Sequence, residues 1–258
     1  MNILFTLCGR AGSKGVKGKN TRDFCGKPLP LFSLNAVFLY LERYKSKDDN
    51  AIIALNTDSP ELIDIITKHM PDVFVIKRDS SLAGDIVPKV AVIRDCLINA
   101  ENHFGYLFDI VVDLDITSPL RKVSDIKNAI EKKLSREDTD VVFSVTSSRR
   151  NPYFNMVKQE NGYYVKVMPS SFTTRQQTPV FYDMNASIYV YSVDALKKKK
   201  SELFFNENCD AIFMKDTGVL DIDSEDDYEL MQVIGYYLFE NDDEFKEISQ
   251  IYLQTKED

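Results

Sequence analysis

From residue 2 to residue 146, short β-favouring runs alternate with amphipathic helical patterns, and this alternation constrains the fold more than any other feature. We expect strands at 2–8, 51–55, 73–76, 108–114 and 140–146, with helices between them at 29–43, 60–68, 87–102 and 124–134. Repeated strand–helix–strand units build a mostly parallel sheet that helices cover on both faces. The sequence therefore predicts a Rossmann-like, three-layer α/β/α fold.

The pattern changes between residues 151 and 183. An Asn161-Gly162 pair in this segment predicts a β-hairpin, and several aromatic residues flank it. These residues suit either a β-rich cap or an arm that meets a second subunit. The core pattern then resumes, with strands expected at 186–191 and 211–215, a helix at 224–239 and a short acidic helix near the end. We expect a single domain over 1–258, with 151–183 as a small protruding β-rich arm inserted in it.

The chain carries 40 acidic and 32 basic residues, a formal net charge of −8. This balance argues against binding to nucleic acid or to an anionic membrane surface. No apolar run approaches the roughly 20 residues that a membrane span needs. The four cysteines show no C-x-x-C spacing, so the sequence indicates neither a zinc site nor a disulfide framework and fits a cytoplasmic protein. With only two histidines present, histidine-based catalysis is not expected.

A glycine-rich and basic segment at 7–20 follows the first expected strand. Glycine permits backbone conformations that bring amide groups close to an anion, and Arg10, Lys14, Lys17 and Lys19 add positive charge. The spacing matches neither the Walker loop nor the G-x-G-x-x-G turn of dinucleotide-binding proteins. The segment is typical of a phosphate-binding loop, although the same composition also fits a basic surface turn.

Three further polar clusters follow expected strands. Residues 113–121 bring two carboxylates, two hydroxyls and an arginine into one turn. Asp221 and Asp223 are alternate residues, so in a strand both carboxylates point the same way, as oxygen ligands of Mg²⁺ must. Residues 175–179 and 185–189 combine an arginine suited to a carboxylate with amides suited to sugar hydroxyls. Because ligands of open α/β sheets bind beyond the carboxyl ends of the strands, we expect one site for nucleotidyl transfer.

Several of these motifs occur together in one known family. They are Arg10-Ala11-Gly12-Ser13-Lys14-Gly15 through Lys19-Asn20, Gly26-Lys27-Pro28-Leu29, Asn56-Thr57-Asp58, Arg78 with Leu82-Ala83-Gly84-Asp85, Thr117-Ser118-Pro119-Leu120-Arg121, Arg175-Gln176-Gln177 with Pro179, Asn185 to Tyr189, and Asp221-Ile222-Asp223. Over about residues 2–235 the chain resembles the acylneuraminate cytidylyltransferases, also called CMP-sialic acid synthetases. The first loop together with T-S-P-L-R is the most specific part of the resemblance.

The resemblance implies CTP and an acidic nine-carbon sugar as substrates, N-acetylneuraminate or a bacterial relative such as legionaminate. It also implies Mg²⁺ as the cofactor and a homodimer that exchanges the arm at 151–183. The implied catalytic residues are Arg10, Lys19, Asp221 and Asp223, of which the two aspartates would hold the metal. The nucleotide would be bound by Arg10, Ser13, Lys14, Lys19, Asn20, Arg78, Asp115, Thr117 and Ser118. The sugar would contact Arg175, Gln177, Asn185, Ser187 and Tyr189.

Two residues depart from the family pattern. Asp115 stands where the family usually has a glutamine that reads the cytosine base, and an aspartate can either accept from the cytosine amino group or turn toward the metal. Ala186 stands where the family usually has glycine. Three alternatives stay open: a transferase for 3-deoxy-manno-octulosonate, although the Q-G-D-E-P segment of that family is missing; a transferase for a non-sugar acid; and a catalytically weak nucleotide-binding protein.

Overall fold

A computed structural model describes residues 1–12, 15–198, 208–218 and 221–251 of the chain. Its centre is a seven-stranded sheet with the order β11-β7-β10-β6-β1-β4-β5. The strands are β1 (Asn2–Cys8), β4 (Asn50–Thr57), β5 (Phe74–Lys77), β6 (Ile110–Leu114), β7 (Val141–Ser147), β10 (Tyr182–Ser192) and β11 (Cys209–Phe213). All neighbouring strands of this sheet run parallel except β10, which is antiparallel to both β6 and β7.

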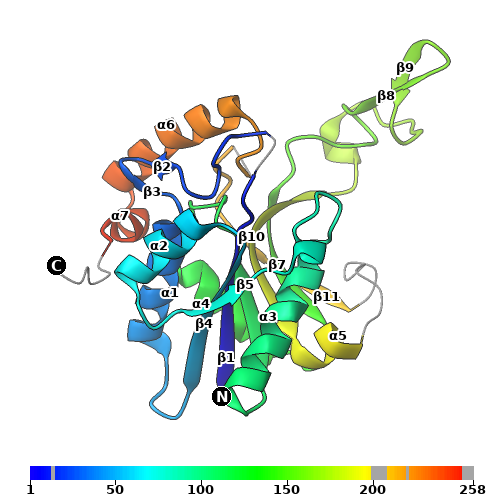
Figure 1. Cartoon of the computed structure of the whole chain (residues 1–258). Coiled ribbons are helices and arrows are strands. Elements are labelled where there is room, and N and C mark those ends of the chain that lie inside the picture. The colour runs from blue at the N-terminus through cyan, green and yellow to red at the C-terminus, as the bar shows by residue number, and fades with distance from the viewer. Residues whose placement is uncertain (13–14, 199–207, 219–220, 252–258) are drawn as a thin grey trace.

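Helices cover both faces of this sheet (Figure 1). One face carries α1 (Pro30–Tyr44), α2 (Pro60–His69), α4 (Val123–Leu134), α6 (Glu225–Asn241) and α7 (Asp243–Ser249). The other face carries α3 (Lys89–Phe104) and α5 (Val193–Lys198). The predicted three-layer α/β/α fold with a mostly parallel sheet is therefore confirmed.

The buried strand β1 shows how the sequence builds these layers. Successive side chains of a strand point to opposite faces, so Ile3, Phe5 and Leu7 enter the larger core beneath α1 and α2, while Leu4 packs beneath α3. Strands buried on both faces read as continuous apolar runs, which is the pattern that marks β1 and β6 in the sequence.

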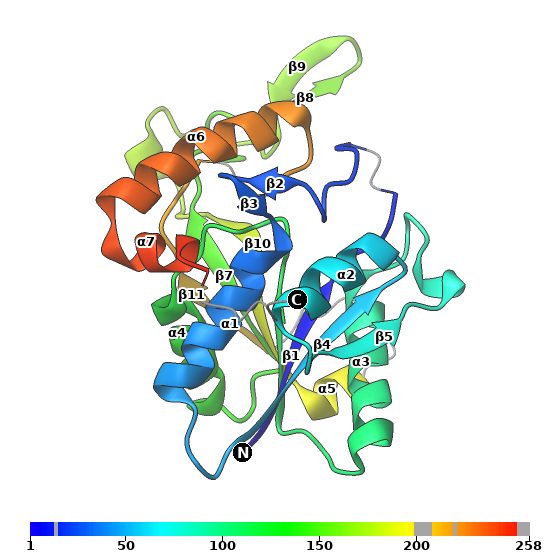
Figure 2. The same cartoon turned by 60° about the vertical axis from the view of Figure 1, so that its left-hand side comes forward.

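A β-hairpin projects from the main body. It consists of β8 (Val157–Glu160) and β9 (Tyr163–Lys166), and Figures 1 and 2 both show it extending away from the sheet. Asn161 and Gly162 join its strands with φ angles of 52° and 84°, the left-handed pair that a tight two-residue turn requires. The predicted hairpin is confirmed, and the arm ends where β10 begins at Tyr182.

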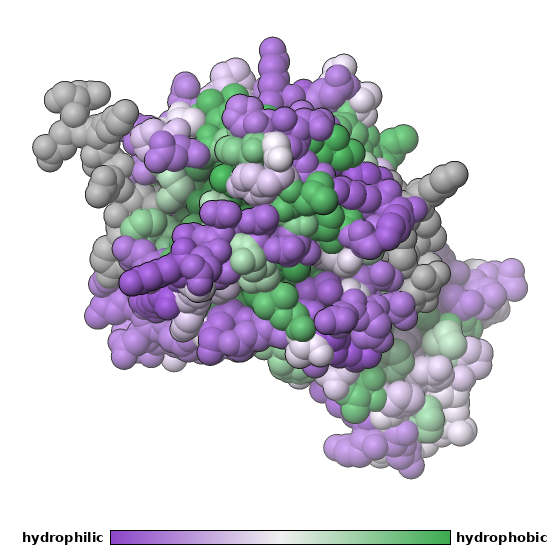
Figure 3. All heavy atoms as spheres, turned by 90° about the horizontal axis from the view of Figure 1, so that it is seen from below, coloured by the Kyte–Doolittle hydropathy of each residue, from purple (hydrophilic) through white to green (hydrophobic). Residues whose placement is uncertain are grey.

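Shorter elements complete the described chain. A small hairpin pairs β2 (Asp23–Phe24) with β3 (Lys27–Pro28), and 3₁₀ turns occur at η1 (Ser80–Leu82) and η2 (Arg175–Gln177). Seen from below, the molecule has hydrophobic residues near the middle of the surface and hydrophilic residues around them (Figure 3). Within the described ranges, no helix is long and apolar enough to cross a membrane.

Candidate active site

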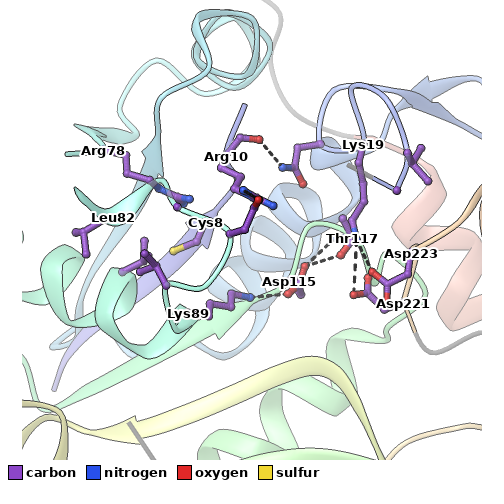
Figure 4. A pocket seen from close by; sticks show the side chains of 17 residues that line it. Cys8, Arg10, Lys19, Arg78, Leu82, Lys89, Asp115, Thr117, Asp221 and Asp223 are labelled. Atoms are coloured by element: carbon purple, nitrogen blue, oxygen red, sulfur yellow. Dashed lines mark hydrogen bonds and ion pairs between the residues drawn. The ribbon is translucent and has the colours of Figure 1, made fainter. Parts of the chain in front are cut away.

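A cavity of about 340 Å³ opens at the edge of the sheet where β1 and β6 end (Figure 4). The segments that line it follow β1, β5 and β6 or precede α6, so they are far apart in the sequence. The lining residues are Cys8, Arg10, Gly15, Val16, Lys19, Asn20, Arg78, Leu82, Gly84, Asp85, Val87, Lys89, Val92, Asp115, Thr117, Asp221 and Asp223. Its volume and place fit a ligand site of an open α/β sheet.

Close packing at Gly9 fixes the start of the loop after β1. A Cβ atom on this glycine would lie 2.7 Å from Cδ2 of Leu62 and 3.0 Å from Cδ1 of Ile116, so a larger residue would force these side chains to shift. The Gly9 amide donates to the Asn56 carbonyl of β4 at 3.2 Å. The loop therefore leaves the sheet along the wall of the cavity because glycine permits this close approach.

Polar contacts hold the loop in place beyond Gly9. The Ala11 amide donates to Asp58 Oδ1 at 2.7 Å, and Asn20 Nδ2 donates to the Arg10 carbonyl at 3.0 Å. The Arg10 guanidinium extends across the cavity and pairs with Asp85, with 2.5 Å between Nη1 and Oδ1. Arg10 and Asn20, predicted to bind the nucleotide, thus lie together in the cavity. The predicted residues Ser13 and Lys14 lie outside the described part of the chain.

Lys19 joins this loop to the segment that carries the paired aspartates. Its ammonium lies 3.0 Å from Asp223 Oδ1 and 3.8 Å from Asp221 Oδ2 (Figure 4). The backbones also touch, because a Cβ atom on Gly15 would overlap the carbonyl oxygen of Asp223. Residues 221–223 do not form the expected strand, yet both carboxylates approach the same cation. Convergence therefore arises from the packing of the two segments rather than from strand alternation.

The aspartate pair is suited to a hard cation. Burial raises the pKa of Asp221, the nearby Asp115 carboxylate raises it further, and Thr117 and Lys19 oppose the rise without cancelling it. A divalent cation would relieve this repulsion between carboxylates. Among the described residues, no group of three or more histidine, cysteine or acidic side chains is arranged to hold a metal alone. Two carboxylates completed by substrate phosphates and water are the usual set for Mg²⁺, so the residues present fit it.

Asp115 points toward a lysine that the sequence motifs did not include. Lys89, the first residue of α3, places its ammonium 2.6 Å from Asp115 Oδ2 and 2.7 Å from Asp113 Oδ2. Asp115 Oδ1 accepts from the amide and the hydroxyl of Thr117 at 3.0 and 2.8 Å. Burial alone would raise the pKa of Asp115, but Lys89 and Thr117 outweigh it and lower this pKa to about 2. Asp115 is therefore an ionised acceptor.

One feature of the sequence could have drawn attention to Lys89. The positive end of the helix macrodipole disfavours a lysine at a helix N-terminus, so Lys89 at the start of an expected helix needs a compensating partner. Two aspartates at the end of a neighbouring strand supply that compensation.

The arginine of the T-S-P-L-R motif is structural. Arg121 is fully buried, and its guanidinium donates to the hydroxyls of Ser33 and Ser187 and to the carbonyls of Asp115 and Ser118. These contacts bind the turn after β6 to α1 and β10. The predicted nucleotide residue Thr117 lines the cavity, whereas Ser118 is nearly buried in the turn and is not one of the lining residues.

Arg78 lies on the side of the cavity away from Asp221 and Asp223 (Figure 4). Its Nε donates to Asn56 Oδ1 at 2.8 Å, and one terminal nitrogen donates to the Asn56 carbonyl at 2.9 Å. Asn56 is oriented in turn by Asp95, which accepts from its Nδ2 at 3.0 Å. Asn56 of the Asn56-Thr57-Asp58 motif therefore holds Arg78, which is predicted to bind the nucleotide, in position.

The residues predicted to bind the sugar do not line this cavity. Arg175 lines a separate cavity of about 230 Å³ and donates to the Arg149 carbonyl, while Gln177 accepts from the backbone amides of residues 173 and 174. Asn185 and Ser187 are buried, where Asn185 accepts from Ser144 and Ser187 accepts from Arg121. Tyr189 is half-buried on β10, and burial raises its pKa to about 12. Among the described residues, a single chain therefore brings most of the expected nucleotide residues and both expected metal residues to one cavity, but not the expected sugar residues.

The chain is similar to several known proteins over most of its length. A family model described as cytidylyltransferase matches residues 7–257. The chain is 38% identical to the CMP-N,N'-diacetyllegionaminic acid synthase of Campylobacter jejuni and 37% identical to the post-translational flagellin modification protein B of Campylobacter coli. Each match spans 232 residues, which are 90% of this chain and 94% of the relative.

The fold comparison points the same way. A solved structure of CMP:2-keto-3-deoxy-manno-octonic acid synthetase complexed with CTP matches with a TM-score of 0.64 and 15% identity, over 92% of this chain and 99% of that one. At this identity the likeness concerns the fold. With the family match spanning nearly the whole chain and two relatives above 30% identity, the resemblance seen in the motifs is confirmed: the chain belongs to the cytidylyltransferase family.

Proposed function

We propose that this protein transfers CMP from CTP to the anomeric hydroxyl of an acidic nonulosonate sugar and releases pyrophosphate. The observation that carries the proposal is the single cavity that gathers Arg10, Lys19 and Asn20 of the loop with Asp221 and Asp223. A cationic loop facing a carboxylate pair is what a triphosphate with its metal ion requires.

In the proposed reaction, the sugar hydroxyl oxygen forms a bond to the α-phosphorus of CTP. The bond from that phosphorus to the bridging oxygen of the β-phosphate breaks, pyrophosphate leaves and the hydroxyl proton is released. Such a displacement depends on alignment and charge neutralisation more than on a protein nucleophile. The described cavity suits this requirement, since Arg10 and Lys19 supply positive charge while Asn20 fixes the loop backbone.

Asp221 and Asp223 are the residues that would hold Mg²⁺. When bound, the ion would supply charge neutralisation for the phosphates and for the leaving pyrophosphate. In the chain itself Lys19 already lies between both carboxylates, so a cationic side chain and the metal ligands face the same part of the cavity. This arrangement keeps the positive charge close to where the negative charge of the triphosphate would increase.

We propose a di-N-acetylated nonulosonate of the legionaminate type as the first sugar to test, with N-acetylneuraminate as the second. The support is the 38% identity to a relative named as the synthase for CMP-N,N'-diacetyllegionaminic acid. The match to the CMP:2-keto-3-deoxy-manno-octonic acid synthetase has 15% identity and supports only the fold, so it does not favour the shorter sugar.

We further propose a cytoplasmic homodimer with no nucleic-acid or membrane partner. The projecting arm within 151–183 supports the dimer, because its exposed aromatic side chains Tyr163 and Tyr164 are costly to leave in water. Arg175 lies away from the cavity of its own chain. In a dimer it would instead contribute to the sugar site of the partner chain. The net charge of −8 agrees with the absence of a nucleic-acid or membrane partner from the proposal. The four cysteines form no disulfide, which agrees with a cytoplasmic protein.

The test is pyrophosphate release with Mg²⁺, each of the four nucleoside triphosphates and a panel of keto-acid sugars. The proposal expects release with CTP only, and only with nine-carbon acids. Release with a non-sugar acid would replace the sugar part of the proposal. No release with any pair of substrates would overturn the transferase function as a whole.

A further inference from the structure

Cys8 and Cys96 bring two sulfur atoms together at the wall of the cavity. Cys8 is the last residue of β1, Cys96 lies fully buried on α3, and their Sγ atoms are 3.9 Å apart. The two residues are 88 positions apart in the sequence, so only the packing of α3 on the sheet makes them neighbours. Both are free thiols, and the proposed transfer reaction uses neither of them.

The two thiols differ in their access to the cavity. Cys8 lines it, and Figure 4 shows this side chain on the same side of the cavity as Arg78 and Lys89. Cys96 lies in the core beneath α3, where burial raises the pKa of its thiol well above the usual range and the neighbouring Cys8 raises it further. A peroxide that enters the cavity therefore meets Cys8, while Cys96 waits beside it as a protonated thiol.

A bond between the two sulfurs would displace the end of β1. The sulfur atoms of a disulfide lie about 2.05 Å apart, so those of Cys8 and Cys96 must approach each other by roughly 2 Å. Gly9 follows directly, is packed closely against neighbouring side chains and donates its amide to the Asn56 carbonyl, so the backbone has little room to absorb the change. The displacement is therefore passed on to Arg10 and to the loop proposed to hold the triphosphate.

We propose that Cys8 and Cys96 form a modification site for hydrogen peroxide, whose disulfide prevents the cavity from binding CTP; the effect on CTP rests on the proposed function. First, the Cys8 sulfur attacks one peroxide oxygen and the O–O bond breaks. The departing hydroxide takes the thiol proton and leaves as water, which gives a sulfenic acid on Cys8.

The second step closes the disulfide. The Cys96 sulfur attacks the Cys8 sulfur, the S–O bond breaks, and the hydroxide leaves with the Cys96 proton as a second water molecule. Two thiols are thereby oxidised to one disulfide, and one hydrogen peroxide is reduced to two water molecules. Because the two sulfurs are already neighbours in the folded chain, this step is intramolecular and favoured by proximity. A dithiol reductant reverses it by thiol–disulfide exchange.

Cys25 provides a matched control within the same chain. It is also a free thiol, but its Sγ donates to the Gln232 carbonyl of α6 at 3.6 Å, and burial raises its pKa to about 12. It is not one of the described residues that line the cavity. Cys25→Ser should therefore respond to peroxide as the wild-type protein does.

The test treats the reduced protein with a small molar excess of hydrogen peroxide and then measures its intact mass and its affinity for CTP. The wild-type mass should fall by two hydrogen atoms, and peptide mapping should show Cys8 joined to Cys96. The CTP affinity should fall by at least about 10-fold, because a displacement of about 1 Å in a site can cost that much. Dithiothreitol should restore the mass and the affinity, and CTP added before the peroxide should slow the oxidation.

Two variants separate the disulfide from other oxidation. In Cys96→Ala, peroxide should add one oxygen to Cys8, trapped as a dimedone adduct, in place of the loss of two hydrogens. In Cys8→Ala, the buried Cys96 should stay reduced at the same peroxide concentration. Neither variant should form the disulfide, so the result does not depend on the folding of one of them.

Two results would overturn the inference. One is wild-type protein in which peroxide does not join Cys8 to Cys96, and the other is a disulfide that leaves the affinity for CTP unchanged. Reduced wild-type protein that binds no CTP would instead contradict the proposed function, while the mass measurement would still test the disulfide by itself. The two failures are therefore distinguishable.

Discussion

Ala186 has a backbone conformation that alanine rarely adopts. Its φ angle is 53°, in the left-handed region, and it lies where the pairing of β10 with β7 shifts register between Met184 and Tyr189. This residue is also one of the two departures from the resemblance noted in the sequence, where glycine is usual. The structure therefore keeps the left-handed bend, and the alanine carries a steric cost of roughly 1–2 kcal/mol.

Ala186→Gly should consequently raise the free energy of unfolding by about 0.5–1 kcal/mol, because relief of strain exceeds the extra entropy that glycine gives the unfolded chain. Urea titration of the purified protein measures this change. Ala129→Gly in the middle of α4 is the matched control and should destabilise the protein by about 1 kcal/mol or more. Equal destabilisation by both variants would show that the bend is not strained.

Asp223 is an exposed carboxylate whose contacts are to the cavity rather than to the core. Its side chain is 79% exposed, so Asp223→Asn should leave the melting temperature nearly unchanged. The same substitution should lower kcat by at least about 100-fold, because it removes a charge proposed to hold Mg²⁺. Asp226→Asn, which makes the same change in the first turn of α6, should retain full activity. Normal turnover in Asp223→Asn would mean that the metal ligands are assigned wrongly.

Residues with a local signature could be recognised from the sequence, and residues defined by tertiary contacts could not. Arg10, Lys19 and the two aspartates belong to short motifs at the ends of apolar runs, and the structure brings them to one cavity. Lys89 has no motif, and its role follows from Asp113 and Asp115 on another element. Arg121 lies within a motif, yet only the fold shows that it is buried.

The first turn of α4 contains a carboxylate that responds to pH. Asp125 accepts from the Lys122 amide at 2.9 Å, but burial outweighs this hydrogen bond and raises the pKa of Asp125 to about 6. The protonated form is therefore favoured in the folded state. Its stabilising effect is complete below the unfolded pKa near 4 and is lost as the pH rises through about 6.

Asp125→Asn keeps the acceptor for Lys122 but cannot ionise. The difference in unfolding free energy between variant and wild type should therefore grow in favour of the variant between pH 4 and 6, by up to about 3 kcal/mol, and stay constant above pH 7. Denaturant titrations across this range provide the measurement. A difference that does not vary with pH would contradict the raised pKa.

The elements themselves were predicted well where hydrophobic periodicity was strong. Strands β1, β4 and β6 and helices α1 and α3 begin and end within a few residues of the expected bounds. Strand β10 begins at Tyr182 rather than at residue 186. It runs antiparallel to its neighbours because the chain returns from the arm at the same end of the sheet at which β7 leaves it, so that Tyr182 pairs with Ser147. No local pattern carries this information, since strand direction depends on the connection.

The projecting hairpin leads to a prediction about the oligomeric state of the protein. Tyr163 and Tyr164 are 76% and 73% exposed, and replacing both with serine removes apolar surface without disturbing the core. If the arm joins two chains, this double variant should shift the molecular mass from dimer toward monomer in analytical ultracentrifugation. Tyr236→Ser, which removes an exposed ring from α6, should leave the mass unchanged. A wild-type monomer would contradict the homodimer directly.

Most of the residues predicted to bind the nucleotide lie around one cavity of a single chain, whereas the residues predicted to bind the sugar do not. Arg10 and Asp115 lie at one cavity because the parallel strands β1 and β6 end at the same edge of the sheet, which the sequence pattern predicts. Lys19 and Asp221 come together there through the packing of their two segments. Arg175 belongs to the arm region and lines a different cavity. Its role as a sugar ligand stays a prediction that depends on how two chains assemble, and no single-chain sequence pattern specifies that geometry.

Transfer of CMP to a sugar is tested most directly by ³¹P NMR of the protein with CTP, Mg²⁺ and N,N'-diacetyllegionaminate. The proposed reaction predicts one new phosphodiester resonance and inorganic pyrophosphate in equal amounts, at the expense of CTP. Hydrolysis to CMP or CDP without a new phosphodiester, or no consumption of CTP with this sugar and with N-acetylneuraminate, would contradict it.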